Sequence, residues 1–378
     1  MKSICTIFFV TAGVLLSVAG YGQDMPKSFN STGTSSAPYV SIEDRQHQSP
    51  LRYLAEDIPA LPGFRLAAAR ALPGVVHILA GYMPGLTKPT EPLTAIYDDA
   101  LWTNPGVGAS RAILGSASGV ILTDDGLVLT CFHCVNNALR LEVVLQDRRV
   151  FKATVLATDS MTDIALLQIE ARNLRFVQLG SYDSLEIGDW VMAVGYPLNL
   201  ASTVTVGVVS AKARYMGDIF IRNGVSTFIQ TDAVVSEGSS GGPLLDSKGK
   251  LVGVNSGIIT TNNLYAGYSF AVPVNVISKI CNDLLHYGKV YRVDIGASFR
   301  NVADKKGVRV ASVDPGSPAQ KAGLQPGDVL TALNGEEISC LGWLEDALLL
   351  FQPGDMIVLG VKRKDNTFSV SLQLAALR

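Results

Sequence analysis

Short apolar runs rich in β-branched residues recur along the chain from residue 116 onward, and turn signals separate them. The first set covers residues 119–122, 127–130, 141–145, 155–157 and 164–169, and the second covers residues 190–194, 203–209, 228–230, 251–254 and 268–272. The sequence Asp124-Asp125-Gly126 is a tight-turn signal between two of these runs. Because many short strands are most simply accommodated in closed sheets, the pattern predicts a mostly β protein with two antiparallel barrels.

The pattern changes after the second set of runs. Apolar residues over 274–287 recur with helical periodicity, and Gly288 follows as a signal for the helix end. From Lys289 onward strand-like runs return, together with the hairpin signal Asn334-Gly335. The boundary predicts a separate C-terminal unit.

The N-terminal residues predict a targeting segment. Lys2 precedes an apolar run from Ile4 to Gly20, so residues 1–22 are expected to be a secretory signal peptide. An uncleaved N-terminal anchor is the alternative, because the run is at the short edge of the about 20 apolar residues that span a bilayer. Residues 23–65 are rich in small and polar residues and predict a flexible lead-in.

Composition narrows the class of protein. The chain has 378 residues, of which 48% are apolar and 36 are glycine, and this suits a β-rich globular protein of two or three compact units. Its formal net charge is −2, and it has no dense block of Lys and Arg. Nucleic acid is therefore not an indicated partner.

The candidate chemistry lies in residues 238–242, a Gly-Ser-Ser-Gly-Gly bend that follows a strand-like run. A serine there can act as a nucleophile if a base, a group that orients the base and backbone N–H donors lie nearby. His133 and Asp163 precede Ser240 in one of the known chain orders of a catalytic triad. Each residue alone has a structural explanation, as a structural histidine, a turn or N-cap aspartate, or a loop serine. Their order and spacing together favour the triad.

From about residue 73 to the C-terminus, the chain resembles the HtrA (Deg) family of trypsin-like serine proteases with one PDZ domain. Segments 118–122, 228–233 and 241–244, together with the His133 and Asp163 segments, fall in the family's order. The resemblance implies a chymotrypsin-like double β-barrel protease domain over residues 66–288, followed by an α+β PDZ domain over residues 289–378. Residues 73–80 would form the first strand, and residues 81–115 the long loop over the active-site mouth.

The resemblance also implies roles for individual residues. His133 would act as general base and then as general acid. Asp163 would hold the His133 ring in the required tautomer, and Ser240 would attack the carbonyl of the substrate. The N–H groups of Gly238 and Ser240 would form the oxyanion hole. Arg214 matches the family arginine that relays regulatory signals to the oxyanion loop.

The substrate pocket is expected to be apolar. In the resemblance Val234 and Val235 stand at its base, with Ile258 and Tyr268 on its walls, and no acidic residue matches the aspartate of trypsin. Such a pocket selects small or medium apolar side chains, with modest discrimination because one methylene is worth about 1 to 3 kcal/mol. Glu237 departs from the family pattern, and its carboxylate would oppose oxyanion development unless it faces solvent or pairs.

The PDZ resemblance implies a peptide-binding groove between a strand near residues 295–299 and a helix over residues 341–351. An extended peptide would add to the strand, and a loop of backbone amides would hold its C-terminal carboxylate. That loop maps to Asp294, Ile295, Gly296 and Ala297. Ala297 is smaller than the apolar residue usual in the family.

Cys131 and Cys134 bracket His133 in a C-x-x-C arrangement. In an oxidising compartment the pair could close a disulfide, and the alternative is two buried free thiols beside the active site. His47, His77 and His286 lack ligand spacing to this cluster, so neither a metal site nor a cofactor is expected.

These features predict a periplasmic serine endopeptidase that cleaves unfolded or misfolded envelope proteins under the control of its PDZ domain. A regulatory, site-specific protease of an envelope stress response is one alternative. A chaperone-like binder with little proteolysis is another, although the complete triad argues against it. The family resemblance implies a homotrimer or a larger homo-oligomer.

Overall fold

The computed structural model describes residues 41–48, 63–82, 113–197, 202–215, 227–261, 264–302 and 306–377. The expected signal peptide, most of the lead-in and most of the 81–115 loop lie outside these residues. The chain divides into two compact units. One comprises the described residues up to Ser210 together with Gln230–Gly288, and the other comprises Ala211–Ile229 and Lys289–Arg378.

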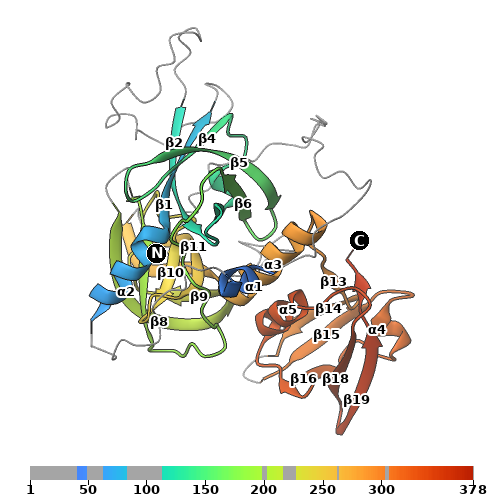
Figure 1. Cartoon of the computed structure of the whole chain (residues 1–378). Coiled ribbons are helices and arrows are strands. Elements are labelled where there is room, and N and C mark those ends of the chain that lie inside the picture. Colours follow the sequence, from blue (N-terminus) through green and yellow to red (C-terminus); the bar gives the residue numbers. More distant parts are fainter. Residues whose placement is uncertain are drawn as a thin grey trace, which may run out of the picture. The chain divides into compact units, whose positions relative to one another are not determined.

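Two closed antiparallel barrels confirm the expected protease fold (Figure 1). The first has the strand order β1-β2-β3-β6-β5-β4, and the second has the order β10-β11-β12-β9-β8-β7. The strands of the first barrel are Val75–Tyr82 (β1), Ile113–Ile121 (β2), Leu127–Cys131 (β3), Arg140–Val144 (β4), Val150–Asp159 (β5) and Ile164–Ile169 (β6). The strands of the second barrel are Trp190–Gly195 (β7), Thr203–Tyr215 (β8), Thr227–Thr231 (β9), Pro243–Asp246 (β10), Leu251–Thr261 (β11) and Leu264–Pro273 (β12).

The pairing of β3 with β6 matters most for the site. Their antiparallel register runs from Leu127 opposite Gln168 to Cys131 opposite Ile164. Aliphatic side chains on both strands are buried in the first barrel, where each contributes about 1.5 to 3 kcal/mol of burial free energy. This register brings the residues after Cys131 beside the residue before Ile164, so His133 and Asp163 lie side by side.

Strand β10 is absent from the runs predicted above. It is only four residues long and follows the glycine bend directly, yet it pairs with both β11 and β7. Leu244 and Leu245 are fully buried. This segment is a strand because it pairs on both sides, and neither its length nor an alternation of apolar and polar residues predicts it.

Part of the predicted lead-in, residues 42–48, has regular structure. Residues Ile42–Gln48 form helix α1, in which the Asp44 backbone N–H donates to Ser41 Oγ at 3.1 Å. Ile42 is buried, and the Gln46 side chain donates to the Leu122 carbonyl at 2.9 Å. A polar composition conceals a buried apolar side chain and several long-range contacts, among them the Leu179 N–H that donates to Gln46 Oε1 and the Arg45–Asp125 ion pair.

Further helical segments of the first unit flank its barrels. Helix α2 (Phe64–Ala71) and a 3₁₀ turn (Leu72–Gly74) lead into β1, and helix α3 (Val274–Tyr287) follows β12. Helix α3 buries one apolar face, and Gly288 ends it in a left-handed conformation with φ of 69°. The predicted helix and its end are confirmed. Among the described residues, no helix is long and apolar enough to cross a bilayer.

The second unit has the expected α+β PDZ architecture. Its main sheet has the order β14-β15-β16-β18-β19, with β17 on β16, and β13 pairs with β20. The elements are Val293–Asp294 (β13), Ala297–Asn301 (β14), Val308–Val313 (β15), Pro318–Lys321 (α4), Val329–Leu333 (β16), Glu336–Glu337 (β17), Leu341–Leu349 (α5), Met356–Arg363 (β18), Asn366–Gln373 (β19) and Ala375–Ala376 (β20). Asn334 and Gly335 both have positive φ, as the hairpin signal predicts.

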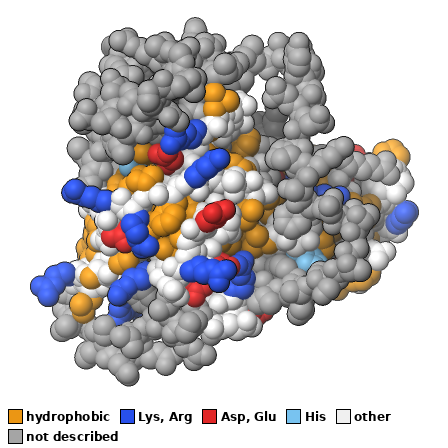
Figure 2. Space-filling view, turned by 45° about the horizontal axis from the view of Figure 1, so that its top comes forward, with side chains coloured by type: hydrophobic (Ala, Val, Ile, Leu, Met, Phe, Trp, Pro, Cys, Tyr) orange, Lys and Arg blue, Asp and Glu red, His pale blue; other side chains and the backbone are white. Residues whose placement is uncertain are grey.

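The charged surface agrees with the near-neutral net charge. On the face shown in Figure 2, Lys and Arg side chains are interspersed with Asp and Glu. No strip of one sign is visible among the described residues of that face.

Candidate active site

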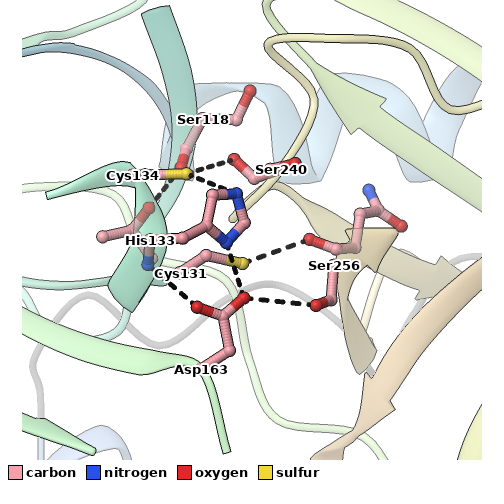
Figure 3. A network of polar contacts seen from close by, with 9 residues as sticks. Ser118, Cys131, His133, Cys134, Asp163, Ser240 and Ser256 are labelled. Atoms are coloured by element: carbon pink, nitrogen blue, oxygen red, sulfur yellow. Dashed lines mark hydrogen bonds and ion pairs between the residues drawn. The ribbon is translucent and has the colours of Figure 1, made fainter. Parts of the chain in front are cut away.

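Asp163 and His133 form the centre of the site (Figure 3). His133 lies in a 3₁₀ turn (Phe132–Cys134) directly after β3, and Asp163 lies directly before β6 with φ of 57°. Asp163 Oδ1 accepts the His133 backbone N–H at 2.8 Å, and Oδ2 contacts His133 Nδ1 at 2.7 Å. Ser256 Oγ donates to the same Oδ2 at 3.3 Å. The carboxylate therefore fixes both the backbone and the ring of His133.

The other ring nitrogen of His133 faces a thiol. Cys134 Sγ lies 3.4 Å from His133 Nε2 and 3.9 Å from the Ser240 carbonyl oxygen. Ser240 lies on the same side of the ring as Cys134 (Figure 3). Among the described residues, no hydrogen bond joins the Ser240 hydroxyl to His133. The structure thus brings the three predicted catalytic residues together, with Cys134 rather than Ser240 in contact with Nε2.

The Ser240 bend is held against β2. The Ser118 backbone N–H donates to the Ser240 carbonyl at 2.9 Å, and Ser118 Oγ donates to the Gly238 carbonyl at 2.7 Å. Gly241 has φ of 83°, and a Cβ there would lie 2.3 Å from the Ser118 carbonyl oxygen. Only glycine permits this close approach of two backbones.

Two backbone N–H groups in the bend have no acceptor among the described residues. The neighbouring N–H groups of Ser239 and Gly242 donate to the carbonyls of Ser236 and Ser239. The N–H groups of Gly238 and Ser240 donate to no acceptor among the described residues. These are the two donors that the sequence predicted for the oxyanion hole, and buried donors without an acceptor are rare unless they have a function.

The electrostatics of the three neighbouring side chains are coupled. Burial acts to lower the pKa of His133, but the Cys134 and Asp163 charges and hydrogen bonds outweigh it and raise that pKa well above its usual value. Contact with the Cys131 thiol, followed by the effect of His133, lowers the pKa of Cys134 to about 6. The same contact and complete burial raise the pKa of Cys131. The arrangement favours a thiolate at Cys134 beside an imidazolium.

Cys131 and Cys134 are both free thiols. Together with His133 they place one donor atom each within 4.8 Å of one another, and no other such group occurs in the described part of the chain. Three donors fall short of the four ligands of a closed structural zinc site. We assign no resident metal to this cluster.

The predicted pocket residues differ in their placement. Val234 is 45% exposed, and its carbonyl accepts a hydrogen bond from Thr205 Oγ1 at 2.7 Å. Val234, Ser236 and Ser239 line a small cavity beside the Ser240 bend. Val235 is buried, and Tyr268 is 42% exposed. The side chain of Ile258 lies outside the described residues.

The two remaining candidates, Glu237 and Arg214, are exposed. The Glu237 side chain faces solvent, the condition under which its charge would least oppose an oxyanion. The Arg214 side chain is exposed near the end of β8.

The predicted carboxylate loop of the second unit lies between β13 and β14. Ile295 is buried, and its carbonyl accepts the Ala319 N–H at 2.9 Å. Asp294 Oδ1 accepts the Gly296 N–H at 2.7 Å. Ala297 opens β14, whose Asn301 caps the start of α5 by accepting the Leu341 N–H. The side chain of Asp294 therefore occupies one amide of the loop that would hold a peptide carboxylate.

The sequence predicted no individual role for two residues of the site, Ser118 and Ser256. Ser118 stands in a segment noted only for its resemblance, and Ser256 had no signal at all. Ser118 is 0% exposed, and its hydroxyl accepts the Tyr196 N–H at 2.8 Å while donating to Gly238. A buried small polar residue in an apolar strand is the signal that could have identified Ser118.

Comparison with protein families agrees with both units. A family model described as "Trypsin-like peptidase domain" matches residues 117–254, and one described as "PDZ domain" matches residues 293–374. The first region contains His133, Asp163 and Ser240, and the second contains the candidate groove.

Curated proteins and solved structures are similar to the chain over most of its length. A probable periplasmic serine endoprotease DegP-like of Chlamydia muridarum (strain MoPn / Nigg) is 32% identical over 406 residues, which cover 100% of this chain and 79% of that protein. Its counterpart of Pseudomonas putida (strain GB-1) is 35% identical, with 84% and 71% covered. The solved structure of the HtrA-type protease AlgW with tripeptide superposes with a TM-score of 0.65 at 27% identity, covering 84% of this chain and 98% of that one. The serine endoprotease from Yersinia pestis gives a TM-score of 0.55 at 30% identity, with 85% and 100% covered.

Proposed function

Because the chain belongs to the DegP-like (HtrA) family of trypsin-like serine endoproteases with a PDZ domain, we propose that Ser240, His133 and Asp163 form its catalytic triad. The observation that carries this proposal is the double contact of Asp163 with His133 beside a serine bend with two unoccupied N–H donors. In this proposal a base, its orienting group, a nucleophile and oxyanion donors act at one place.

The proposed chemistry is acyl transfer. His133 Nε2 takes the proton of the Ser240 hydroxyl as its oxygen attacks the peptide carbonyl, and Asp163 holds the proton on Nδ1. The N–H groups of Gly238 and Ser240 stabilise the negative oxygen, a contribution worth about 10²- to 10³-fold in kcat per donor. His133 then protonates the leaving amine, and water releases the acyl group by the reverse sequence. Before attack, the Ser240 hydroxyl must replace Cys134 at Nε2.

The proposed substrates are unfolded or misfolded polypeptides of the cell envelope. Relatives are named periplasmic endoproteases, which supports export of this chain to the periplasm, with residues 1–22 as a signal peptide or an anchor. The PDZ domain would bind C-terminal peptides in the groove beside β14. It would regulate cleavage through Arg214, which matches the family arginine that relays regulatory signals to the oxyanion loop. The assembly is proposed to be a homotrimer or larger, from family resemblance.

A fluorophosphonate probe tests the nucleophile directly, because only a serine activated by a base reacts. Wild-type protein should label at one site and cleave casein, and Ser240→Ala should abolish both. Ser239→Ala is the matched control, since this neighbouring serine is equally buried and should retain labelling. Labelling that persists in Ser240→Ala would reject the assignment. His133→Ala should also lose both activities.

A regulatory, site-specific protease is the second candidate. The contact of Cys134 with Nε2 favours it, because a base held away from its nucleophile is a restrained state. A protease of this kind would label slowly and leave casein largely intact until a peptide with an apolar C-terminus is added. A chaperone-like binder would neither label nor cleave under any of these conditions.

A further inference from the structure

Two thiols flank the candidate base, and the proposed mechanism uses neither. Cys131 ends β3, and Cys134 ends the 3₁₀ turn that carries His133. Their sulfur atoms belong to the group of donors that lie within 4.8 Å of one another. Rotation about the Cα–Cβ bonds can shorten such a distance to the about 2.05 Å of a disulfide, and the tight turn keeps the two backbones near each other.

The two thiols differ in access and in reactivity. Cys131 is 0% exposed, and its thiol points to the Asn255 carbonyl at 3.5 Å. Cys134 is half-buried, and its sulfur contacts His133 Nε2 and the Ser240 carbonyl oxygen. The lowered pKa of Cys134 and the raised pKa of Cys131 add to this division, since the thiolate is the nucleophile in disulfide exchange. Cys134 has the properties of an attacking thiol, and Cys131 those of a resolving thiol.

We propose that Cys131 and Cys134 are a thiol–disulfide exchange site for low-molecular-weight disulfides, and that closing their disulfide frees His133 Nε2 for Ser240. The Cys134 thiolate attacks one sulfur of the disulfide, forming a mixed disulfide and releasing one thiolate. Cys131 then attacks Cys134 Sγ, giving up its proton to the first released thiolate, and the second sulfur of the oxidant leaves as a thiolate. The protein loses two electrons and the proton of Cys131, and the oxidant becomes one thiol and one thiolate.

The direction of the effect follows from the position of Cys134. In the dithiol state its sulfur lies 3.4 Å from Nε2, where the Ser240 hydroxyl must donate its proton. Bond formation with Cys131 draws this sulfur away from Nε2 and removes a negative charge that holds the imidazolium. The oxidised enzyme is therefore the active form, and the dithiol enzyme is restrained. This effect rests on the proposed role of His133, whereas the exchange site itself does not.

The test uses the full-length protein equilibrated in oxidised or reduced glutathione. Mass spectrometry after alkylation should show a Cys131–Cys134 disulfide in the oxidised sample of both wild type and Ser240→Ala. The fluorophosphonate labelling rate of the wild type at pH 7 should rise roughly tenfold on oxidation, a fraction of the about 10²- to 10⁴-fold that a general base contributes. Thiols that stay reduced in excess oxidised glutathione, or a labelling rate that falls on oxidation, would overturn the proposal.

Two single variants separate the steps. Cys134→Ala removes the thiol from Nε2, so it should label fast in either buffer. Cys131→Ala keeps that thiol but cannot close the ring, so it should label slowly when reduced and hold one glutathione when oxidised. Cys340→Ser is the control, because this half-buried cysteine lies in the PDZ unit, and it should behave as the wild type. If the disulfide forms but neither state labels, the proposed serine chemistry fails while the exchange site stands.

Discussion

Asp163 binds His133 twice, through Oδ1 to the backbone N–H at 2.8 Å and through Oδ2 to Nδ1 at 2.7 Å. The first contact places the turn that carries the histidine, and the second places its ring. Asp163 adopts a left-handed backbone conformation to reach both atoms. This conformation is uncommon for a residue other than glycine, and it is tolerated best by short polar side chains such as aspartate.

Replacing Asp163 with asparagine should separate these two contacts. In Asp163→Asn the amide oxygen can still accept the backbone N–H, whereas the amide NH₂ would face Nδ1 and force the proton onto Nε2. We expect kcat to fall by about 10⁴-fold, since a wrong tautomer cannot accept the Ser240 proton. The measurement is peptide hydrolysis alongside a thermal melt. A variant within tenfold of the wild type would remove Asp163 from the triad.

Ser118 should act as a positioning residue for the oxyanion loop. Its hydroxyl links the Tyr196 N–H to the Gly238 carbonyl, and it is fully buried. Ser118→Ala leaves both groups without their partner, at a cost of about 1 to 3 kcal/mol of folding free energy. We expect kcat to fall with little change in KM, because the oxyanion is stabilised only in the transition state.

Ser116→Ala is the matched control for this prediction. Ser116 lies two residues away on β2, and its hydroxyl hydrogen-bonds His77 Nε2 at 2.8 Å rather than the Gly238 carbonyl. Its loss should alter the melting temperature without the drop in kcat. Equal kinetic losses in both variants would mean that Ser118 acts only through general stability.

The pH dependence of the reduced enzyme should reveal the thiol beside the base. His133 faces Asp163 and Cys134. The Tyr82 hydroxyl donates to the Cys134 carbonyl, and the Cys131 thiol contacts Cys134. Because its pKa is raised, His133 stays protonated to a higher pH and becomes a base only above that pKa. The acid limb of kcat/KM should therefore lie well above pH 6.5, with activity lost as pH falls through it.

Substitution of Cys134 supplies the comparison. In Cys134→Ala the largest charge that raises the pKa of His133 is gone, so the acid limb should move to lower pH. The profiles are recorded in a reducing buffer to keep the wild type in its dithiol state. Superimposable acid limbs would show that Cys134 does not influence the base.

The PDZ loop should bind carboxylates better without the charge of Asp294. Its Oδ1 accepts the Gly296 N–H at 2.7 Å, next to the amides that a peptide C-terminus would need. Asp294→Asn keeps an acceptor and removes the negative charge, so affinity for a peptide with a free C-terminus should rise by about fivefold. Fluorescence anisotropy at two salt concentrations measures this, with the amidated peptide as control. A gain shared equally by the amidated peptide would contradict the charge argument.

Local pattern was sufficient for most of the secondary structure. The run 164–169 predicted β6 to the residue, and the apolar periodicity over 274–287 predicted α3, because burial repeats with the geometry of each element. The order of His133, Asp163 and Ser240 and the glycines around the serine likewise pointed to one site. Their triad roles stay a prediction until they are tested.

Only the tertiary structure decided how these residues meet. Strand β10 exists because two neighbours pair with it, and α1 exists because Ile42 finds a buried place. Ser118 reaches the Gly238 carbonyl across 120 positions, and this contact depends on the closure and register of a barrel. Cys134 was visible in the sequence as a neighbour of His133, but a side-chain direction is set by packing around its Cα–Cβ bond. That packing, rather than the sequence neighbourhood, places its sulfur at Nε2, where the serine is needed.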